Sequence, residues 1–290
     1  MYSTSSYPSS VATGDFNQDS KIDLAVTNSM NYTISVLIGN GNGTFKTQRL
    51  YATCYVPQQL ITQDFNGDNK LDLITISYSS DMICVHLGYG NGTFTTPPKL
   101  FPTGGSLPIS LVTAKFNQDS MLDVAVANYG NNTISVLFGY GNGSFQTPPT
   151  IYSAGSGPRF IVTGDFNGDT RIDLAIVNAL SNTIGVFIGN IDGTFQSQRV
   201  YPTGGVGPTQ LIVVDVNQDN VQDLITTNNS GSSVSICQGV GDGTFLTCEI
   251  YPTGLSPISL ANNDFNGDNK QDLVVLNNGE NTISILTGQC

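Results

Sequence analysis

Histidine and basic residues are scarce in this chain of 290 residues, and this scarcity excludes several classes of function. His86 is the single histidine, so neither a Ser-His-Asp nor a Cys-His catalytic arrangement can be proposed with it. It lies in the apolar run 83–87, where a core or edge histidine is more common than a catalytic one. Ten Lys and Arg stand against 22 Asp and Glu, and the net charge of -12 argues against nucleic acid or an anionic membrane surface as a partner.

Long apolar runs are missing as well. No run of 18 or more apolar residues occurs, so we expect no insertion into a membrane. The first six residues are polar and lack the apolar core of an export signal, so either such a signal has been removed or export does not use that route.

The five cysteines are too few and too scattered for a disulfide scaffold, and their spacing matches no zinc motif. Cys237 and Cys248 flank a hairpin at 242–243 and would lie opposite each other if those two residues form the turn. A disulfide between them is one of two open alternatives, and Cys290, at the terminus, is the candidate for the odd cysteine.

In contrast, one acidic segment of nine residues, which first occurs at 15–23, is repeated along the chain. Six copies begin at residues 15, 64, 115, 165, 215 and 264, with steps of 49, 51, 50, 50 and 49 residues. A period of this size is typical of a repeat architecture. Of the 22 acidic residues, 17 lie in these segments, and only Asp81, Asp192, Asp242, Glu249 and Glu280 lie elsewhere.

The spacing of oxygen-bearing side chains within a segment predicts a calcium loop. Calcium takes six to eight hard oxygen ligands, and a short loop can offer alternate side chains plus one backbone carbonyl. Positions 1, 3, 5 and 9 would contribute side-chain oxygens and position 7 its carbonyl. The predicted ligands are Asp15, Asn17, Asp19, Lys21, Asp23; Asp64, Asn66, Asp68, Lys70, Asp72; Asp165, Asn167, Asp169, Arg171, Asp173; Asp215, Asn217, Asp219, Val221, Asp223; and Asp264, Asn266, Asp268, Lys270, Asp272.

The third segment departs from this pattern, because Lys115 replaces the first aspartate. Its ammonium could take the place of an ion beside Asn117, Asp119 and Asp123, so we expect a weak or empty site there and about five calcium ions in all. Five ions would reduce the net charge from -12 to about -2.

Two other interpretations of the segments have to be weighed. An Asp- and Asn-rich loop is often only a turn, since these side chains bond their own backbone. An EF-hand would need a bidentate Glu at position 12 between two helices, whereas position 12 here is always Val, Thr or Ile. The repetition of one spacing six times favours calcium over a simple turn.

Four short strands are expected in each repeat, with no helical period anywhere. In the fourth repeat they cover 160–164, 174–178, 183–188 and 194–201, and Asp192-Gly193 marks the last hairpin. Units of this kind cover one another's faces when they pack radially, so the prediction is an all-β fold, a six-bladed β-propeller of four-stranded antiparallel blades. The approximate blades of this single domain (1–290) are 8–56, 57–106, 107–156, 157–206, 207–255, and 256–290 completed by 1–7.

These segments resemble the calcium loops of the FG-GAP/VCBS repeat family, as in the second copy, Asp64-Phe65-Asn66-Gly67-Asp68-Asn69-Lys70-Leu71-Asp72. The resemblance extends over essentially all of the chain. It implies a β-propeller with ions in the loops between the first and second strands of each blade. Integrin α heads, fungal propeller lectins and many secreted proteins of unknown role share such repeats, so the family implies no single activity.

A non-enzymatic recognition or adhesion module is the function that this pattern favours, with an extracellular protein or a glycan as ligand and a monomer as the expected state. A multivalent calcium-dependent lectin is the alternative, and a propeller-based hydrolase or lyase is the second alternative. For the lectin, Tyr51, Tyr152, Tyr201 and Tyr251 recur after the last strand of a blade, where packing between blades is the first interpretation and sugar stacking the other.

Six N-x-[ST] sequons and loops suited to millimolar calcium favour a secreted or cell-surface location. They lie at Asn31, Asn42, Asn91, Asn131, Asn142 and Asn228. Asn-Gly-Thr is also good turn chemistry, so these sequences have a purely structural interpretation too.

Overall fold

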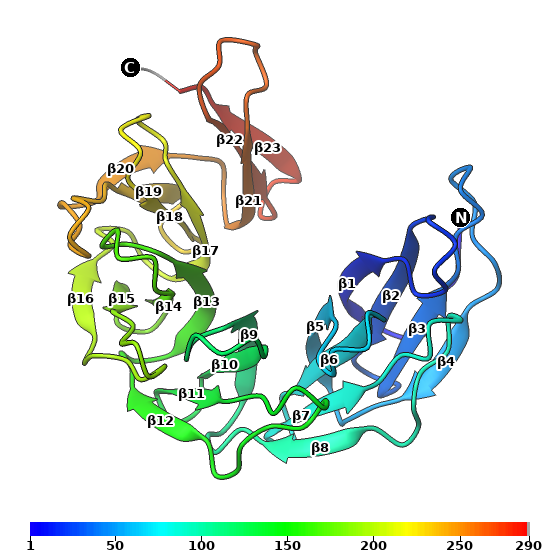
Figure 1. Ribbon diagram of the computed structural model, residues 1–290. Helices are drawn as coiled ribbons and strands as arrows, with labels where there is room; N and C mark the ends of the chain where they lie inside the picture. The colour runs from blue at the N-terminus through cyan, green and yellow to red at the C-terminus, as the bar shows by residue number, and fades with distance from the viewer. Residues whose placement is uncertain (289–290) are drawn as a thin grey trace. The chain divides into compact units, whose positions relative to one another are not determined.

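The computed structural model describes residues 1–288, in which 23 strands form six antiparallel sheets and no helix occurs (Figure 1). The expected all-β class is confirmed, and the sheets are consistent with a β-propeller. In this part of the chain no helix is long and apolar enough to cross a membrane.

The first three sheets each contain four strands in chain order. They are β1 (Pro8–Gly14), β2 (Asp23–Asn28), β3 (Thr33–Leu37) and β4 (Arg49–Ala52); β5 (Pro57–Gln63), β6 (Asp72–Ser77), β7 (Met82–His86) and β8 (Lys99–Pro102); β9 (Pro108–Ala114), β10 (Asp123–Asn128), β11 (Thr133–Leu137) and β12 (Thr150–Ser153).

The next two sheets repeat this order, and the sixth has three strands. They are β13 (Pro158–Gly164), β14 (Asp173–Asn178), β15 (Thr183–Phe187) and β16 (Arg199–Pro202); β17 (Pro208–Val214), β18 (Asp223–Asn228), β19 (Ser233–Cys237) and β20 (Glu249–Pro252); β21 (Pro257–Asn263), β22 (Asp272–Asn277) and β23 (Thr282–Leu286).

The chain forms two compact units. The first comprises Met1–Lys115 and Asp119–Ile151, and the second comprises Phe116–Gln118 and the chain from Tyr152 onward. The first three sheets, except for the end of β12, therefore belong to the first unit and the last three to the second. The single propeller domain expected from the sequence stays a prediction.

Neighbouring sheets within each unit bury their apolar faces against each other. In the first unit, Ile83 and Val85 of the second sheet pack in one cluster with Leu111 and Val124 of the third. In the second unit, Ile184 and Val186 pack with Leu211 and Leu224 in the same way. Because β-branched and leucine side chains occupy both faces of the second strands, these strands are almost completely buried and fix the stacking of the sheets.

The fourth strand of each blade is shorter than its sequence suggests. In the fourth repeat, the expected strand 194–201 is β16, which begins only at Arg199. The hairpin contains an isolated bridge between Gly189 and Phe195, whereas the ladder pairs Val186 with Arg199. The register therefore shifts by one residue between bridge and ladder, and the chain cannot pair continuously through the hairpin.

The sixth sheet lacks a described fourth strand. Its completion by residues 1–7 stays a prediction, because the described contacts of these residues are with the first sheet and its hairpins. Tyr2, for example, packs edge-on against Phe45 at 5.4 Å between ring centroids, and Asn28 accepts the N–H of Ser5. Ile283 and Ile285 of β23 are 59% and 58% exposed, whereas Ile184 and Val186 at the same places in β15 are buried.

Two disulfides join cysteines of the described residues. Cys237 pairs with Cys248, which was one of the two alternatives left open by the sequence. The β19–β20 register places these two residues opposite each other. The bridge between Gly239 and Phe245 nevertheless centres the hairpin on Asp242, so Asp242 and Gly243 do not form a two-residue turn. Cys290 lies outside the described residues.

The second disulfide joins Cys54 to Cys84, with 6.2 Å between their Cα atoms. In the third sheet the same two places are held by Gly105 and Ser135, and Asn128 lies between them, hydrogen-bonded to Ser135 and in close contact with Gly105. Alignment of the repeats could have identified this pair, because the two cysteines stand where the third repeat has Gly105 and Ser135.

Candidate metal-binding loops

Each nine-residue segment is the loop between the first and second strands of a sheet. In the second sheet, β5 ends at Gln63 and the loop begins at Asp64, while the ninth residue, Asp72, is also the first residue of β6. The other sheets repeat this arrangement. The structure thus brings the predicted ligands of each loop together at one end of its own sheet.

The ninth-position aspartates close the loops from inside the fold, and all six are fully buried. In the second sheet, one carboxylate oxygen of Asp72 accepts the N–H of Phe65 at 2.9 Å, and the other accepts the N–H of Gly88 at 2.7 Å. Gly39, Gly139, Gly189, Gly239 and Gly288 donate to their own aspartates at 2.7–2.9 Å. In the first, second, fourth, fifth and sixth sheets the carboxylate therefore ties the start of its loop to the glycine that follows the third strand.

Burial raises the pKa of Asp72 to about 6, against the hydrogen bonds from Gly88 and Phe65, which lower it. The negative charges of Asp68 and Asp64 raise the pKa further. Burial and the neighbouring loop carboxylates also raise the pKa of Asp173 and of Asp223. The carboxylates of one loop are thus close enough to repel one another, which is the electrostatic situation that a bound cation relieves.

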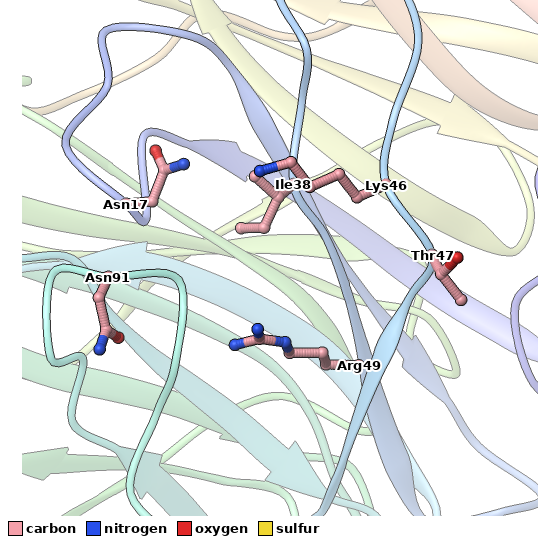
Figure 2. A pocket seen from close by; sticks show the side chains of 6 residues that line it. All are labelled: Asn17, Ile38, Lys46, Thr47, Arg49 and Asn91. Carbon is pink, nitrogen blue, oxygen red and sulfur yellow. The ribbon is translucent and has the colours of Figure 1, made fainter.

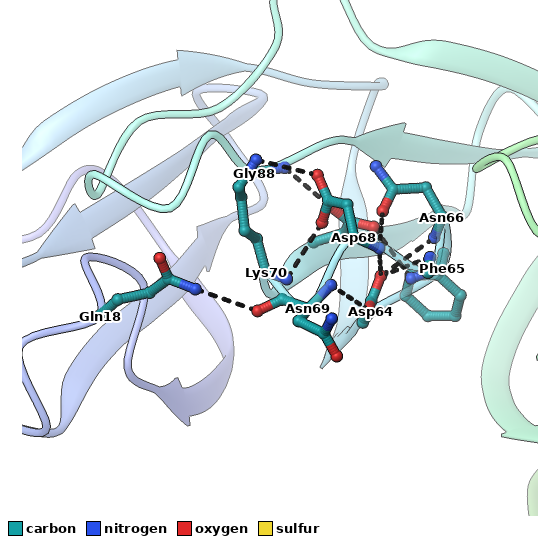
Figure 3. A network of polar contacts seen from close by, with 10 residues as sticks. Gln18, Asp64, Phe65, Asn66, Asp68, Asn69, Lys70 and Gly88 are labelled. Carbon is teal, nitrogen blue, oxygen red and sulfur yellow. Dashed lines mark hydrogen bonds and ion pairs between the residues drawn. The ribbon is translucent and has the colours of Figure 1, made fainter.

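The outer positions of the loop bond the loop's own backbone, as Figure 3 shows for the second sheet. Asp64 accepts the N–H groups of Gly67 and Asn69, at 2.8 and 2.7 Å. Asn66 accepts the N–H of Asp68, and Asp68 accepts that of Lys70, both at 3.0 Å. This is the self-bonded turn that the sequence allowed as an alternative.

Two left-handed residues curl each loop except the third. In the first loop Gln18 and Ser20 have φ values of 58° and 64°, and in the second Gly67 and Asn69 have 73° and 61°. The fourth and sixth positions are accordingly occupied by Gly, Gln, Asn, Ser or Thr, and the side chains at positions 1, 3 and 5 converge as a result.

The seventh-position side chains form ion pairs that the sequence interpretation missed. Lys21 pairs with Asp19 at 3.5 Å, Lys70 pairs with Asp68 at 3.2 Å, and Arg171 pairs with Asp169. Only the carbonyl of this position was expected to matter. The signal was present, since four of the six loops carry Lys or Arg there.

The loops also hold the adjacent sheet, a second feature not foreseen. The N–H of Gly92, in the hairpin of the second sheet, donates to the carbonyl of Phe16 in the first loop at 2.8 Å. Gly143 bonds Phe65 in the same way at 3.0 Å, and Gly243 bonds Phe166 at 2.8 Å. The Gln18 side chain donates to the carbonyl of Asn69 in the next loop at 3.1 Å. A change in loop conformation would therefore affect the neighbouring sheet as well.

The third loop has Lys115 in place of the first aspartate, and the weak or empty calcium site expected there stays a prediction. Lys115 is exposed, Asp119 accepts the N–H of Met121 at 2.7 Å, and Asp123 accepts that of Gly139 at 2.8 Å. Its sixth residue, Ser120, does not have the left-handed conformation that Ser20 and Asn69 have at the same position. The predicted internal ion pair of Lys115 stays a prediction.

The donor set suits calcium, because each regular loop offers three carboxylates, an amide oxygen and a carbonyl, all hard oxygen ligands. Within residues 1–288, however, no three His, Cys, Asp or Glu side chains are arranged to hold a metal ion directly. In the second loop, Asp64 and Asp68 would have to turn from backbone N–H groups and Lys70 toward a cation. Bound calcium would supply the positive charge that offsets their repulsion.

The repeated tyrosines pack between sheets in three of the four cases. Tyr51 contacts Phe94 edge-on at 5.6 Å, Tyr201 contacts Phe245 at 5.5 Å, and the Tyr152 hydroxyl accepts the N–H of Phe195 at 3.1 Å. Tyr251 is 37% exposed and donates to Glu249 at 2.6 Å. The packing interpretation is therefore confirmed for Tyr51, Tyr152 and Tyr201.

His86 is a core residue of β7. It is fully buried, and its Nδ1 lies 2.8 Å from the carbonyl oxygen of Thr95, which makes Nδ1 the protonated nitrogen. Nε2 is buried without a hydrogen-bond partner among the described residues. Burial lowers the pKa of His86, although the bond to Thr95 opposes this shift.

Five of the six sequons are exposed. Asn42, Asn91 and Asn142 lie at hairpin tips, where their side-chain oxygens accept the N–H of the Thr or Ser two residues later at 3.0–3.1 Å. Asp192 and Asp242 do the same in the fourth and fifth sheets. Asn228 is fully buried in β18, so this sequon is not accessible in the folded chain.

The FG-GAP-like repeat matches the chain at residues 15–75, 64–126, 115–176, 165–226 and 215–275. No curated protein matches the chain. Among solved structures, an Agrocybe aegerita lectin that recognises non-reducing terminal N-acetylglucosamine is 17% identical, with 96% of this chain and 80% of the lectin covered and a TM-score of 0.64.

Two further solved structures are similar in fold. A putative 6-phosphogluconolactonase from Bacteroides uniformis is 17% identical, with 98% of this chain and 82% of that one covered and a TM-score of 0.72. A streptogramin B lyase is also 17% identical, with 98% and 84% covered and a TM-score of 0.61. At these identities the likeness concerns the fold alone.

Proposed function

Because the chain belongs to the FG-GAP-like repeat family, we propose that it is a calcium-stabilised recognition module of the extracellular space without enzymatic activity. Calcium would act structurally, in five loops. The third loop, with Lys115, would bind the ion weakly or not at all. An extracellular protein or glycan would be the ligand of a monomeric chain, and neither nucleic acid nor a membrane would be a partner.

The observation that carries this proposal is the buried ninth-position aspartate, repeated six times. Asp72 is fully buried, bonds both ends of its loop, and is repelled by the carboxylates of Asp64 and Asp68. A divalent cation held by these three side chains would turn repulsion into attraction. It would also fix the loop that bonds the hairpin of the next sheet.

Two alternatives follow from the structural neighbours. The likeness to a lectin supports a carbohydrate-binding function, whereas the likeness to a lactonase-like protein and a lyase supports an enzyme. The lectin is the stronger candidate here. The one histidine is a core residue, and all but five of the 22 acidic residues belong to the loops, so few groups are available for acid–base chemistry.

Thermal unfolding in calcium and in a chelator tests the proposal. We expect the melting temperature to fall when EGTA replaces calcium, because a ligand that binds only the folded state stabilises it by mass action. Magnesium at the same concentration is the control, since its strict octahedral geometry suits these loops less well. An identical melting temperature in calcium and in EGTA would contradict a structural role of the ion.

A further inference from the structure

A small pocket lies beside the first loop, between the first and second sheets of the first unit (Figure 2). Its volume is about 280 Å³, and it is lined by Asn17, Ile38, Lys46, Thr47, Arg49 and Asn91. Asn17 is the third residue of the loop, and Asn91 is at the hairpin tip of the second sheet. Lys46, Thr47 and Arg49 belong to the segment that leads into β4 and to its first residue.

Two cations reach into this pocket. Figure 2 shows the Lys46 side chain extending over Ile38 in the direction of Asn17, and the Arg49 side chain extending in the direction of Asn91. Neither cation forms an ion pair within residues 1–288, where the three ion pairs all lie inside the loops. In a chain with ten Lys and Arg and a net charge of -12, two free cations at one pocket indicate an anionic ligand.

The corresponding residues of other sheets have different roles. Lys99, at the start of β8, donates to the carbonyl of Asn142 at 3.1 Å, and Arg199, at the start of β16, donates to that of Asp242 at 3.5 Å. Both thus bond the hairpin tip of the adjacent sheet. Lys46 is replaced by Thr95, Gln146, Gln196 and Leu246 in the following repeats, so the pair of cations is particular to the first sheet.

We propose that this pocket binds the carboxylate of an acidic sugar, such as a uronic acid, an inference that rests on the proposed recognition function. The guanidinium of Arg49 offers the planar fork that matches a carboxylate, and the Lys46 ammonium adds a second charge-assisted bond. The volume of about 280 Å³ lies just below that of ligand pockets, which run from roughly 300 to 1,000 Å³, and this suits a single monosaccharide unit.

The remaining lining favours a sugar over an acidic side chain of a protein. Apart from Ile38, every lining residue is polar: the hydroxyl of Thr47 and the side-chain NH2 group of Asn91 can bond sugar hydroxyl groups, whereas the amide of Asn17 bonds Asp19 of the loop. A protein carboxylate brings only one polar group and would leave these partners unused. Ile38, which is 8% exposed, offers an apolar surface to the face of a sugar ring.

Calorimetric titration of the unglycosylated protein in calcium tests this inference, with glucuronic acid as the probe and glucose as its neutral counterpart. We expect glucuronic acid to bind and glucose to bind at least about tenfold more weakly. The double variant Lys46→Thr, Arg49→Gln should weaken binding of glucuronic acid by at least about tenfold as well. Lys46 and Arg49 are both exposed, so we expect the double variant to fold, and a melting curve that matches that of the original protein would confirm this.

Lys99→Gln is the matched control, because Lys99 starts its strand as Arg49 does but bonds a backbone carbonyl and lies outside the pocket. Its affinity for glucuronic acid should equal that of the original protein. Equal binding of the two sugars, unchanged binding by the double variant, or no binding of glucuronic acid would overturn the inference. If calcium still raises the melting temperature in that case, the proposed calcium-stabilised module stands and only the pocket assignment fails.

Discussion

At the scale of single residues, the glycine that follows each third strand is as important as the aspartate it bonds. Gly88 donates its N–H to the buried carboxylate of Asp72, and a Cβ at this position would overlap the backbone carbonyl oxygen of Leu71. Gly39, Gly139, Gly189 and Gly239 have the same close contact with the residue before their own aspartate. The glycines are required here because the second and third strands approach each other closely.

Gly88→Ala should therefore destabilise the protein. Overpacking against a backbone atom typically costs about 1–3 kcal/mol, and the loss would appear in the free energy of unfolding measured by denaturant titration. The comparison variant is Gly67→Gln in the loop that Asp72 closes: no atom lies near a Cβ there, so this variant carries only the backbone strain of a left-handed residue, a conformation that Gln18 has at the same position of the first loop. Equal stability of the Gly88 variant and the original protein would contradict the close approach.

His86 is the second residue whose environment gives a test. The equivalent residues Leu37 and Leu137 are buried and apolar, whereas the Nε2 of His86 is buried without a partner among the described residues. Burial lowers the pKa of His86, so protonation favours the unfolded chain. This residue's contribution to stability is present above the unfolded-state pKa of about 6.5 and is lost as the pH falls below it.

His86→Leu should remove this part of the pH dependence. Between pH 7 and pH 5, the free energy of unfolding of the original protein should fall relative to that of the variant, because only the original protein gains a proton at this site on unfolding. Urea titrations at several pH values would measure the difference. A difference that does not change with pH would show that the imidazole is not held neutral by burial.

At the scale of one loop, the sequence predicts position and partners better than conformation. The repeated spacing indicates one loop, and the structure joins Asp64, Asn66 and Asp68 in one hydrogen-bonded turn that Asp72 closes through the N–H of Phe65. The pairing of Lys70 with Asp68 and the bond from Gly92 to Phe16 were not predicted. The bond from Gly92 depends on where a neighbouring hairpin lies in space, which spacing within one segment does not encode. The Lys or Arg at position 7 of four loops was a usable signal for the ion pair.

The third loop gives the corresponding test. Lys115→Asp restores the regular set of three carboxylates, and we expect this variant to bind one calcium ion more than the original chain does. Equilibrium dialysis against calcium would count the ions. Lys99→Asp, which adds the same charge change outside the loops, controls for non-specific attraction of cations. The same ion count for Lys115→Asp and the original chain would contradict the role assigned to Lys115.

At the scale of the molecule, hydrophobic patterning predicts most of the fold. The second strands are almost wholly buried, as β14 illustrates, and their continuous apolar sequences indicated sheets covered on both faces. The start of β16 was wrong by five residues, since the Gly189–Phe195 bridge and the ladder that begins at Arg199 differ in register by one residue, which the sequence pattern does not indicate. The Cys54–Cys84 disulfide was missed because it requires comparison of repeats rather than of spacing.

The central claim is that the acidic loops hold calcium, and counting bound ions in the original chain tests it most directly. Native mass spectrometry of the protein after dialysis into calcium should show about five ions per chain, in line with five regular loops and one altered by Lys115. The same preparation in EGTA should show none. A chain that carries no calcium at millimolar concentration would contradict the account, and the loops would then be self-bonded turns that close each sheet.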